Sequence, residues 1–156
     1  MRLSGILGRL LAVVLPLLVL SCARPESDEH FVKPGGRDAM GRYTFSLAMD
    51  DPQYLYDVDV YIVTSADKRH ISPFSEDVLM ELQSPSGARY EETVTFSSET
   101  QVQKTFFTST FLYHYRKDLV PVEFGEWTLS MKFPSDFEET NHANGIGIRL
   151  IRNGSR

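Results

Sequence analysis

Apolar side chains recur at every second position over most of this chain, and that period constrains its fold more than any other feature. The segment 126–133 is the clearest case, because Trp127, Leu129, Met131 and Phe133 alternate with polar residues. A period of two places alternate side chains on opposite faces of a β-strand, whereas an amphipathic helix repeats about every 3.6 residues. The segment therefore predicts a strand with one buried face and one solvent-facing side.

The same alternation predicts further strands along the chain, at 43–49, 54–62, 77–83, 88–96, 106–115 and 145–151. Ser84-Pro-Ser-Gly87 has Pro and Gly where a tight turn needs them, so the strands on either side of it are expected to form a hairpin. About seven short strands joined by turns predict an all-β fold, an antiparallel β-sandwich of Greek-key or jelly-roll type. A closed barrel is the alternative, and 134–144 is expected to be a polar loop or one helical turn.

The N-terminal segment has the order of features expected of an export signal. Arg2 and Arg9 give a basic start, the run 10–20 is apolar, and Cys22 follows a small residue. The apolar run is too short for a membrane-spanning helix, which needs about 20 residues. With Val19-Leu-Ser-Cys22 at the junction, the segment resembles a bacterial lipoprotein signal, in which Cys22 is lipidated, palmitate included, and becomes the first residue. Ordinary secretory cleavage is the alternative.

These features divide the chain into a signal peptide (1–21), a flexible polar tether (22–40), a β-sandwich domain (41–152) and a C-terminal tail (153–156). Loss of the signal peptide moves the net charge from −5 to about −7, because two arginines leave with it. Such a charge disfavours nucleic acid and anionic lipid as partners, since both require clustered Lys and Arg. Ala23 stands where some bacteria have a retention signal for the inner membrane that begins with aspartate. We therefore expect an outer-membrane lipoprotein facing the periplasm or the cell surface.

Five segments occur in a fixed order: Tyr56-Asp-Val-Asp-Val60, Leu79-Met-Glu-Leu-Gln-Ser-Pro-Ser-Gly87, Glu92-Thr-Val-Thr-Phe96, Phe124-Gly-Glu-Trp-Thr-Leu-Ser-Met131 and Asn144-Gly-Ile-Gly-Ile-Arg149. With the signal peptide, and over roughly residues 40–152, they resemble the gliding-motility lipoprotein H family of small envelope lipoproteins. Thr64-Ser-Ala66 departs from the Arg-Asn pair expected at that place. The resemblance implies an accessory or structural role in a cell-envelope assembly, through protein–protein interaction, and it carries over no catalytic residues.

The search for a catalytic or metal-binding motif is mostly negative. No metal-ligand spacing fits the four histidines, which are His30, His70, His114 and His142. The chain also lacks the Gly-x-Ser-x-Gly motif of many hydrolases. Asp57 and Asp59 share one strand face about 7 Å apart, which suits paired acid–base catalysis. The favoured interpretation is a solvated outer face, or a weak calcium site formed with Asp50 and Asp51. We therefore expect a protein that is not an enzyme and that holds no metal or cofactor.

Aromatic residues concentrate in the segment 106–115. Phe107, Phe111, Tyr113 and Tyr115 share one face of this strand, and Phe106 lies on the other. One face must cover the core, so the other is a candidate binding platform, unless a loop buries both. Aromatic rings anchor protein interfaces and stack on sugars. The expected partners are therefore a membrane, reached through the lipid, and an envelope protein. The alternative function is a carbohydrate-binding surface lipoprotein that uses an aromatic face of the sandwich.

Overall fold

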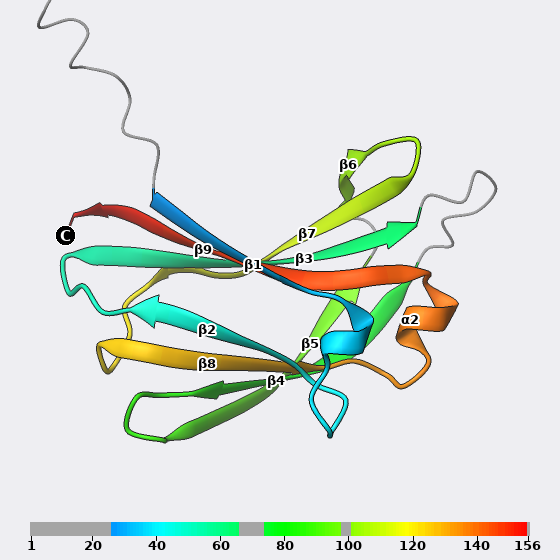
Figure 1. The fold of residues 1–156 in the computed structure, drawn as a ribbon. Helices are drawn as coiled ribbons and strands as arrows, with labels where there is room; N and C mark the ends of the chain where they lie inside the picture. Colours follow the sequence, from blue (N-terminus) through cyan, green and yellow to red (C-terminus); the bar gives the residue numbers. More distant parts are fainter. Residues whose placement is uncertain (1–25, 66–73, 98–100, 156) are drawn as a thin grey trace, which may run out of the picture.

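The computed structural model describes residues 26–65, 74–97 and 101–155, which form two packed β-sheets (Figure 1). Cys22 and His70 lie outside the described residues. The elements in chain order are β1 (Glu26–Val32), η1 (Pro34–Gly36), β2 (Tyr43–Met49), β3 (Tyr54–Ser65), β4 (Ser75–Gln83), β5 (Arg89–Ser97), β6 (Gln101–Lys104), β7 (Thr108–Leu119), β8 (Gly125–Lys132), α2 (Phe137–Thr140) and β9 (Ala143–Ser155).

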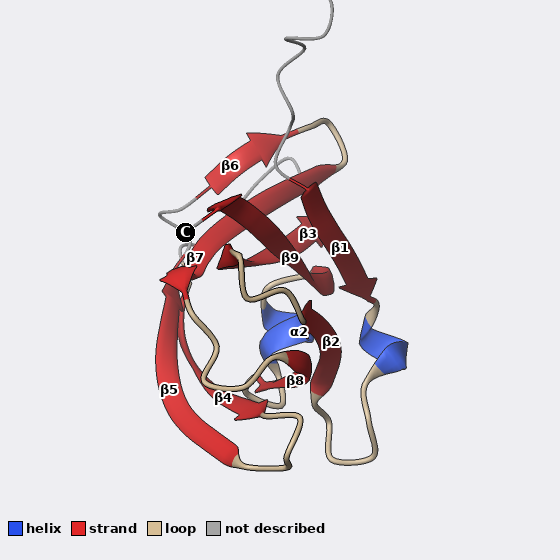
Figure 2. Cartoon of the chain, turned by 90° about the vertical axis from the view of Figure 1, so that its left-hand side faces the viewer, coloured by secondary structure: helices blue, strands red, loops and turns tan. Residues whose placement is uncertain are grey.

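The two sheets have the strand orders β1-β9-β3-β7-β6 and β2-β8-β4-β5, and all neighbouring strands are antiparallel. Apart from the hairpins β4–β5 and β6–β7, consecutive strands lie in different sheets, as the end-on view in Figure 2 shows. If the short β6 is set aside, eight strands form two facing four-stranded sheets, which is the jelly-roll arrangement. The predicted β-sandwich is therefore confirmed, and the two sheets are separate rather than closed into a barrel.

The core lies between the sheets and is built from the inward-facing half of each strand. Trp127, Leu129, Met131 and Phe133 are all buried, as the alternation in β8 predicts, and their exposed fractions are 5%, 0%, 0% and 7%. The neighbouring strand β2 contributes a matching buried set, Tyr43, Phe45, Leu47 and Met49. Burial of each such side chain stabilises the fold by about 1.5–3 kcal/mol. The period of two therefore identifies the core correctly.

The prediction of a flexible tether over 22–40 is wrong at 26–32, because these residues form strand β1. This strand pairs with β9 through seven residue pairs, from Glu26 with Arg152 to Val32 with Ile146. Its side chains are mostly exposed, since β1 is an edge strand. An edge strand needs few core residues, so its composition resembles that of a linker. The predicted tail also begins too early, because β9 continues to Ser155.

Smaller points concern the ends of elements and the loop 134–144. The predicted strand 106–115 begins at Thr108 instead, and residues 106 and 107 form the turn after β6, which the sequence did not reveal. The segment 134–144 contains the expected helical turn, α2, which is anchored by the buried ring of Phe137. The strand expected at 145–151 is longer at both ends.

The pairing registers define the two ends of the sandwich. At one end, named here the Glu26 end, strands β1, β3, β5 and β8 begin and strands β2, β4 and β7 finish. The opposite end, named the α2 end, carries the helix and the turn between β6 and β7. The chain therefore enters the domain at the Glu26 end.

Candidate functional site

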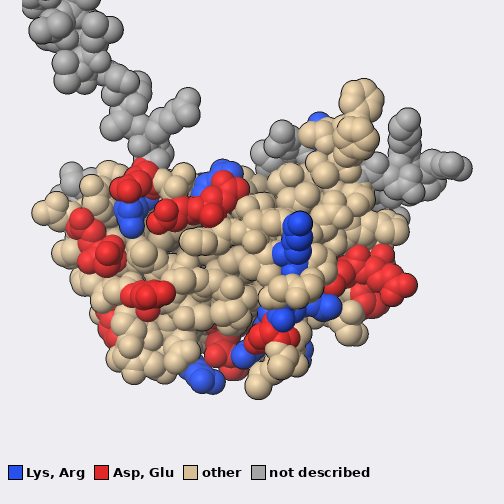
Figure 3. All heavy atoms as spheres, viewed as in Figure 1, with Lys and Arg blue, Asp and Glu red and all other residues tan. Residues whose placement is uncertain are grey.

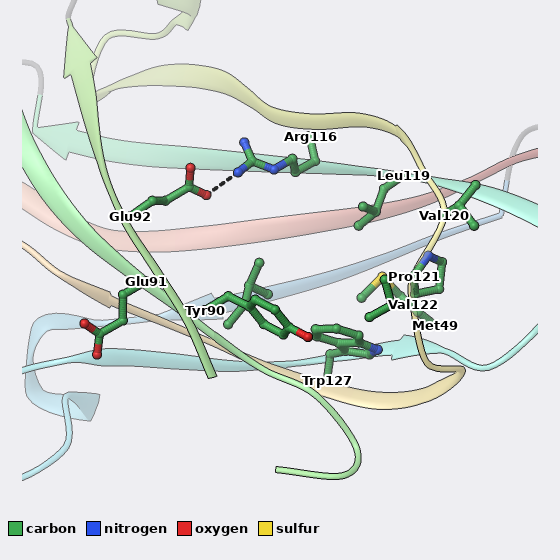
Figure 4. Close-up of a pocket in the computed structure, with 11 residues that line it drawn as sticks. Met49, Tyr90, Glu91, Glu92, Arg116, Leu119, Val120, Pro121, Val122 and Trp127 are labelled. Carbon is green, nitrogen blue, oxygen red and sulfur yellow. Dashed lines mark hydrogen bonds and ion pairs between the residues drawn. The ribbon is translucent and has the colours of Figure 1, made fainter. Parts of the chain in front are cut away.

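An apolar cavity of about 340 Å³ opens between the two sheets at the Glu26 end (Figure 4). It lies where the edge strand β5 faces the end of β7 and the loop that follows it. We call it the Trp127 cavity. The residues that line it are Met49, Leu82, Tyr90, Glu91, Glu92, Arg116, Leu119, Val120, Pro121, Val122 and Trp127. A concave, mostly apolar site with a few polar groups at one wall is the usual form of a binding pocket.

Two stacked aromatic rings form the floor of the cavity. The rings of Tyr90 and Trp127 have centroids 6.0 Å apart and planes 29° from parallel. Figure 4 shows the two side chains next to each other. Trp127 is 5% exposed, and its indole Nε1 donates a hydrogen bond to the Glu123 carbonyl oxygen at 2.9 Å. Tyr90 is 48% exposed, so the stack extends from the core to the surface. A ligand at this site would contact aromatic surface that is held in place by the core.

The loop between β7 and β8 forms an apolar rim. Val120 and Val122, which line the cavity, are 41% and 76% exposed. The Glu123 carboxylate fixes this loop, because it accepts hydrogen bonds from the Ser86 backbone N–H at 3.0 Å and the Ser86 hydroxyl at 2.7 Å. These hydrogen bonds hold the pKa of Glu123 below its usual value. These hydrogen bonds fix the loop to the turn between β4 and β5, while the apolar side chains of the loop remain exposed to solvent.

A β-bulge in β7 builds the polar wall. Val58 pairs with Arg116 while the next residue, Asp59, pairs with His114, so Tyr115 is the extra residue. Both Tyr115 and Arg116 consequently reach Glu92 on the opposite sheet. Glu92 accepts a hydrogen bond from the Tyr115 hydroxyl at 2.6 Å and one from the Arg116 guanidinium.

In this polar wall the Glu92 carboxylate, the Arg116 guanidinium and the Tyr115 side chain interact with one another. Hydrogen bonds from Arg116 and then from Tyr115 lower the pKa of Glu92. Burial, followed by the hydrogen bond to Glu92, raises the pKa of Tyr115. The Arg116 guanidinium also lies 4.4 Å from the centre of the Tyr115 ring. The wall therefore presents a paired carboxylate and guanidinium, so a ligand meets little net charge there.

The predicted aromatic platform does not exist as a surface. Phe111, Tyr113 and Tyr115 are 1%, 8% and 7% exposed, and of the four residues proposed only Phe107 is exposed, at 83%. The inner face of β7 packs against the other sheet, where Phe111 meets the edge of the Phe74 ring at 5.3 Å between centroids. These residues are therefore core, and the site lies instead at Trp127, which the alternation had placed in the core alone.

The structure gives each member of the Asp57–Asp59 pair a separate partner. Asp59 is 3% exposed, and its Oδ1 lies 2.6 Å from the Nδ1 of His114 on the neighbouring strand. Asp57 accepts a hydrogen bond from the Asp118 backbone N–H at 2.8 Å and another from Asn153. The sequence missed the His114–Asp59 pair because its members lie 55 positions apart and meet only through β-pairing.

The other two histidines of the described residues lie far from this pair in the sequence. His30 lies on β1 and His142 in the turn before β9, and both are exposed. Within 26–65, 74–97 and 101–155, no three His, Cys, Asp or Glu side chains are placed to hold a metal ion. In the same part of the chain, no helix has the length and apolar character needed to cross a membrane.

Comparison with known proteins gives one curated similarity. No family model matches the chain, and no solved structure matches it. Methylesterase 2 of Arabidopsis thaliana is 31% identical to it over 121 residues, which are 77% of this chain and 45% of the plant protein. The chain therefore spans less than half the length of the curated protein that it matches.

This similarity corrects one expectation. The sequence predicts a protein that is not an enzyme, and the likeness to a methylesterase contradicts that prediction. The prediction depended on the lack of short catalytic motifs. A search for such motifs finds only catalytic groups that are close together in the sequence. The His114–Asp59 pair shows that this chain brings a base and a carboxylate together from distant strands.

Proposed function

We propose that this chain is a lipid-anchored envelope lipoprotein that takes part in a cell-envelope assembly of the gliding-motility type. In this proposal Cys22 carries the lipid at the outer membrane, and the Trp127 cavity binds a partner protein. The observation that carries the proposal is a fixed apolar cavity whose rim leaves Val122 76% exposed. Exposed apolar surface at the mouth of a pocket is a common mark of an interaction site.

The position of β1 supports the anchoring part of the proposal. Cys22 precedes Glu26, the first residue of β1, by only four positions. Four residues span at most about 14 Å. The sandwich would therefore sit directly on the membrane, with the Glu26 end and its cavity within reach of other envelope proteins.

The lining of the cavity defines what the partner must offer. Aliphatic or aromatic side chains fit between the Tyr90–Trp127 stack and the rim at Val122. Glu92 is already paired with Arg116, so the polar wall offers a ligand little net charge. An apolar segment would therefore bind best in the cavity.

A site-specific crosslink tests the partner. A photoreactive amino acid replaces Val122 in the full-length lipoprotein, and a control chain carries it at Lys132, which is exposed on β8. Irradiation of native membranes should give a discrete crosslinked protein from position 122 and none from position 132. Val122→Asp should abolish recovery of that protein. The absence of any crosslink at 122 would contradict the proposed docking site.

The anchor needs its own test. Cys22→Ala should move the protein from the membrane fraction to the soluble fraction, since no acyl chain would then hold it. The parent chain extracted with detergent and metabolically labelled with palmitate should carry label that the variant lacks. Tight membrane association of Cys22→Ala would contradict lipid anchoring while leaving the crosslinking result unaffected.

Ester hydrolysis is a second candidate function, favoured by the likeness to Methylesterase 2 and by the His114–Asp59 pair. A buried carboxylate that accepts the Nδ1–H of a histidine leaves Nε2 as a base that can activate water. The side chain of His114 is 54% exposed, so substrate and water can reach it. The chain should then hydrolyse small methyl esters, and His114→Gln should abolish the activity. A rate equal to that of buffer alone would exclude this function.

A further inference from the structure

The turn between β6 and β7 presents two adjacent phenylalanines to solvent. Phe106 and Phe107 are each 83% exposed, more than any other large apolar side chain among the described residues. Two-residue hairpin loops normally carry Gly, Asn or Asp, which suit the backbone of the turn. Phenylalanine offers no advantage of that kind, and exposing two rings forgoes the benefit of burying them. Two such exposed rings side by side are a candidate contact point for a partner outside the domain.

Hydrogen bonds hold this tip in one shape. The backbone N–H of Thr105 donates to the Thr108 carbonyl oxygen at 2.8 Å and closes the loop. The Thr105 hydroxyl oxygen accepts the backbone N–H of Phe107 at 3.2 Å and that of Thr108 at 2.9 Å. The two rings thus project from a structured turn, which lowers the entropy that a contact would cost.

The tip projects from the same face of the sandwich as the beginning of β1, although the two lie at opposite ends of the molecule. Figures 1 and 2 place the beginning of β1 and the β6–β7 turn on the same side of the sandwich, the side of the five-stranded sheet. The two points are at opposite ends of that sheet, roughly 40 Å apart over the twelve residues of β3. A lipid on Cys22 and the Phe106–Phe107 tip could consequently touch one flat surface together.

The charges near these two points suit a lipid surface. Lys104, at the base of the tip, is exposed and can reach a phosphate group. Along β1 the acidic residues have arginine partners: Glu29 lies 3.5 Å from Arg149, whereas Glu26 and Asp28 share Arg152, at 3.1 and 3.9 Å. Figure 3 shows such acidic and basic side chains side by side at this edge. Repulsion from headgroup phosphates is thereby reduced.

We propose that Phe106 and Phe107 insert into the interface of the bilayer to which the lipid on Cys22 is attached. The inference rests on the proposed lipid anchor and extends it, because a second contact fixes how the domain lies. The five-stranded sheet then faces the membrane, and the Trp127 cavity opens sideways toward partners. Aromatic side chains with an adjacent cation are the usual composition of such interfacial contacts.

Tryptophan quenching tests the insertion. The purified full-length lipoprotein is reconstituted into phosphatidylcholine vesicles whose acyl chains carry bromine, a quencher of tryptophan emission. Trp127 is 5% exposed and gives a constant background in all variants. Phe106→Trp should lose about half of its added emission, as expected for a ring buried in the acyl-chain boundary. Lys132→Trp, on the four-stranded sheet, is the matched control and should lose none.

Three outcomes separate the two proposals. If the protein floats with the vesicles and only Phe106→Trp is quenched, the insertion is supported. If it floats and the two variants are quenched equally, the insertion is overturned while the anchor stands. If it does not float, the anchor fails, and the insertion fails with it.

A second variant checks the energetic role of the tip. The double variant Phe106→Ser/Phe107→Ser should transfer between vesicles at least about tenfold faster, because two buried rings are lost. An unchanged transfer rate, or a crosslink from position 107 to a protein in native membranes, would overturn the proposal.

Discussion

Tyr90 on β5 stacks on Trp127 of β8 across the intervening strand β4, with 6.0 Å between ring centroids. The pair joins an edge strand to the interior of its sheet and forms the floor of the Trp127 cavity. One residue of the pair is buried and the other is half exposed. Any ligand in the cavity would therefore change the environment of Trp127, whose fluorescence is a direct probe of binding.

Trp127→Ala should lower the free energy of unfolding by about 3–5 kcal/mol, because it removes a large buried ring and enlarges the cavity. Trp127→Phe should cost less, since it keeps an aromatic ring and loses chiefly the hydrogen bond to the Glu123 carbonyl. Urea titration followed by circular dichroism measures both variants. A nearly unchanged midpoint for Trp127→Ala would mean that the ring is not part of the core.

Gly147→Ala should destabilise the fold by about 1–3 kcal/mol through overpacking. The ring of Tyr61 lies across Gly147 and stacks on Phe31, with ring planes 9° apart. A Cβ at position 147 would come within 2.0 Å of the Tyr61 ring. Gly154→Ala is the matched control on the same strand, because nothing lies within 4 Å of its added Cβ. Equal urea midpoints for the two variants would disprove the close packing.

Acid should weaken the Trp127 cavity through Glu92. The pKa of this carboxylate is lowered in the folded protein from its ordinary value of 4.5, so its ionised form stabilises the fold above that pH. This contribution is lost as the pH falls through the folded-state pKa. Glu92→Gln should therefore lose less stability between about pH 5 and pH 3 than the parent chain does.

Urea midpoints measured across this pH range provide the test for Glu92. Glu91→Gln, one position away and exposed, is the control and should keep the acid dependence of the parent. If Glu92→Gln and the parent lost stability in parallel, the ion pair with Arg116 would contribute nothing to the fold.

His114→Ala should cost about 1–3 kcal/mol, because it leaves the buried Asp59 carboxylate without its hydrogen-bond partner. Adding Asp59→Asn to this variant should recover part of the loss, since a neutral amide is cheaper to leave unpaired. Thermal unfolding of both variants gives the comparison. If the double variant is no more stable than His114→Ala, Asp59 has other means of stabilisation in the folded state.

The sequence predicts most of the strands and the core, and the reason is local. In β8 the alternation from Trp127 to Phe133 follows directly from the geometry of a strand with one buried face. The turn Ser84-Pro-Ser-Gly87 likewise specifies the β4–β5 hairpin through the chemistry of its own residues. The sequence pattern does not predict strand β1, because an edge strand is stabilised by pairing with its neighbour, here β9, rather than by its own apolar residues.

The candidate sites could not be predicted in the same way, because they depend on contacts between distant segments. The burial of Phe111, Tyr113 and Tyr115 is decided by the second sheet, and the exposure of Phe106 and Phe107 by the place where β7 begins. The bulge that turns Arg116 toward Glu92 arises from the pairing of β7 with β3. The sequence by itself thus determined the strands and the inward faces, through the period of two. Only the tertiary structure decided which aromatic rings meet solvent, because that depends on which strands cover one another.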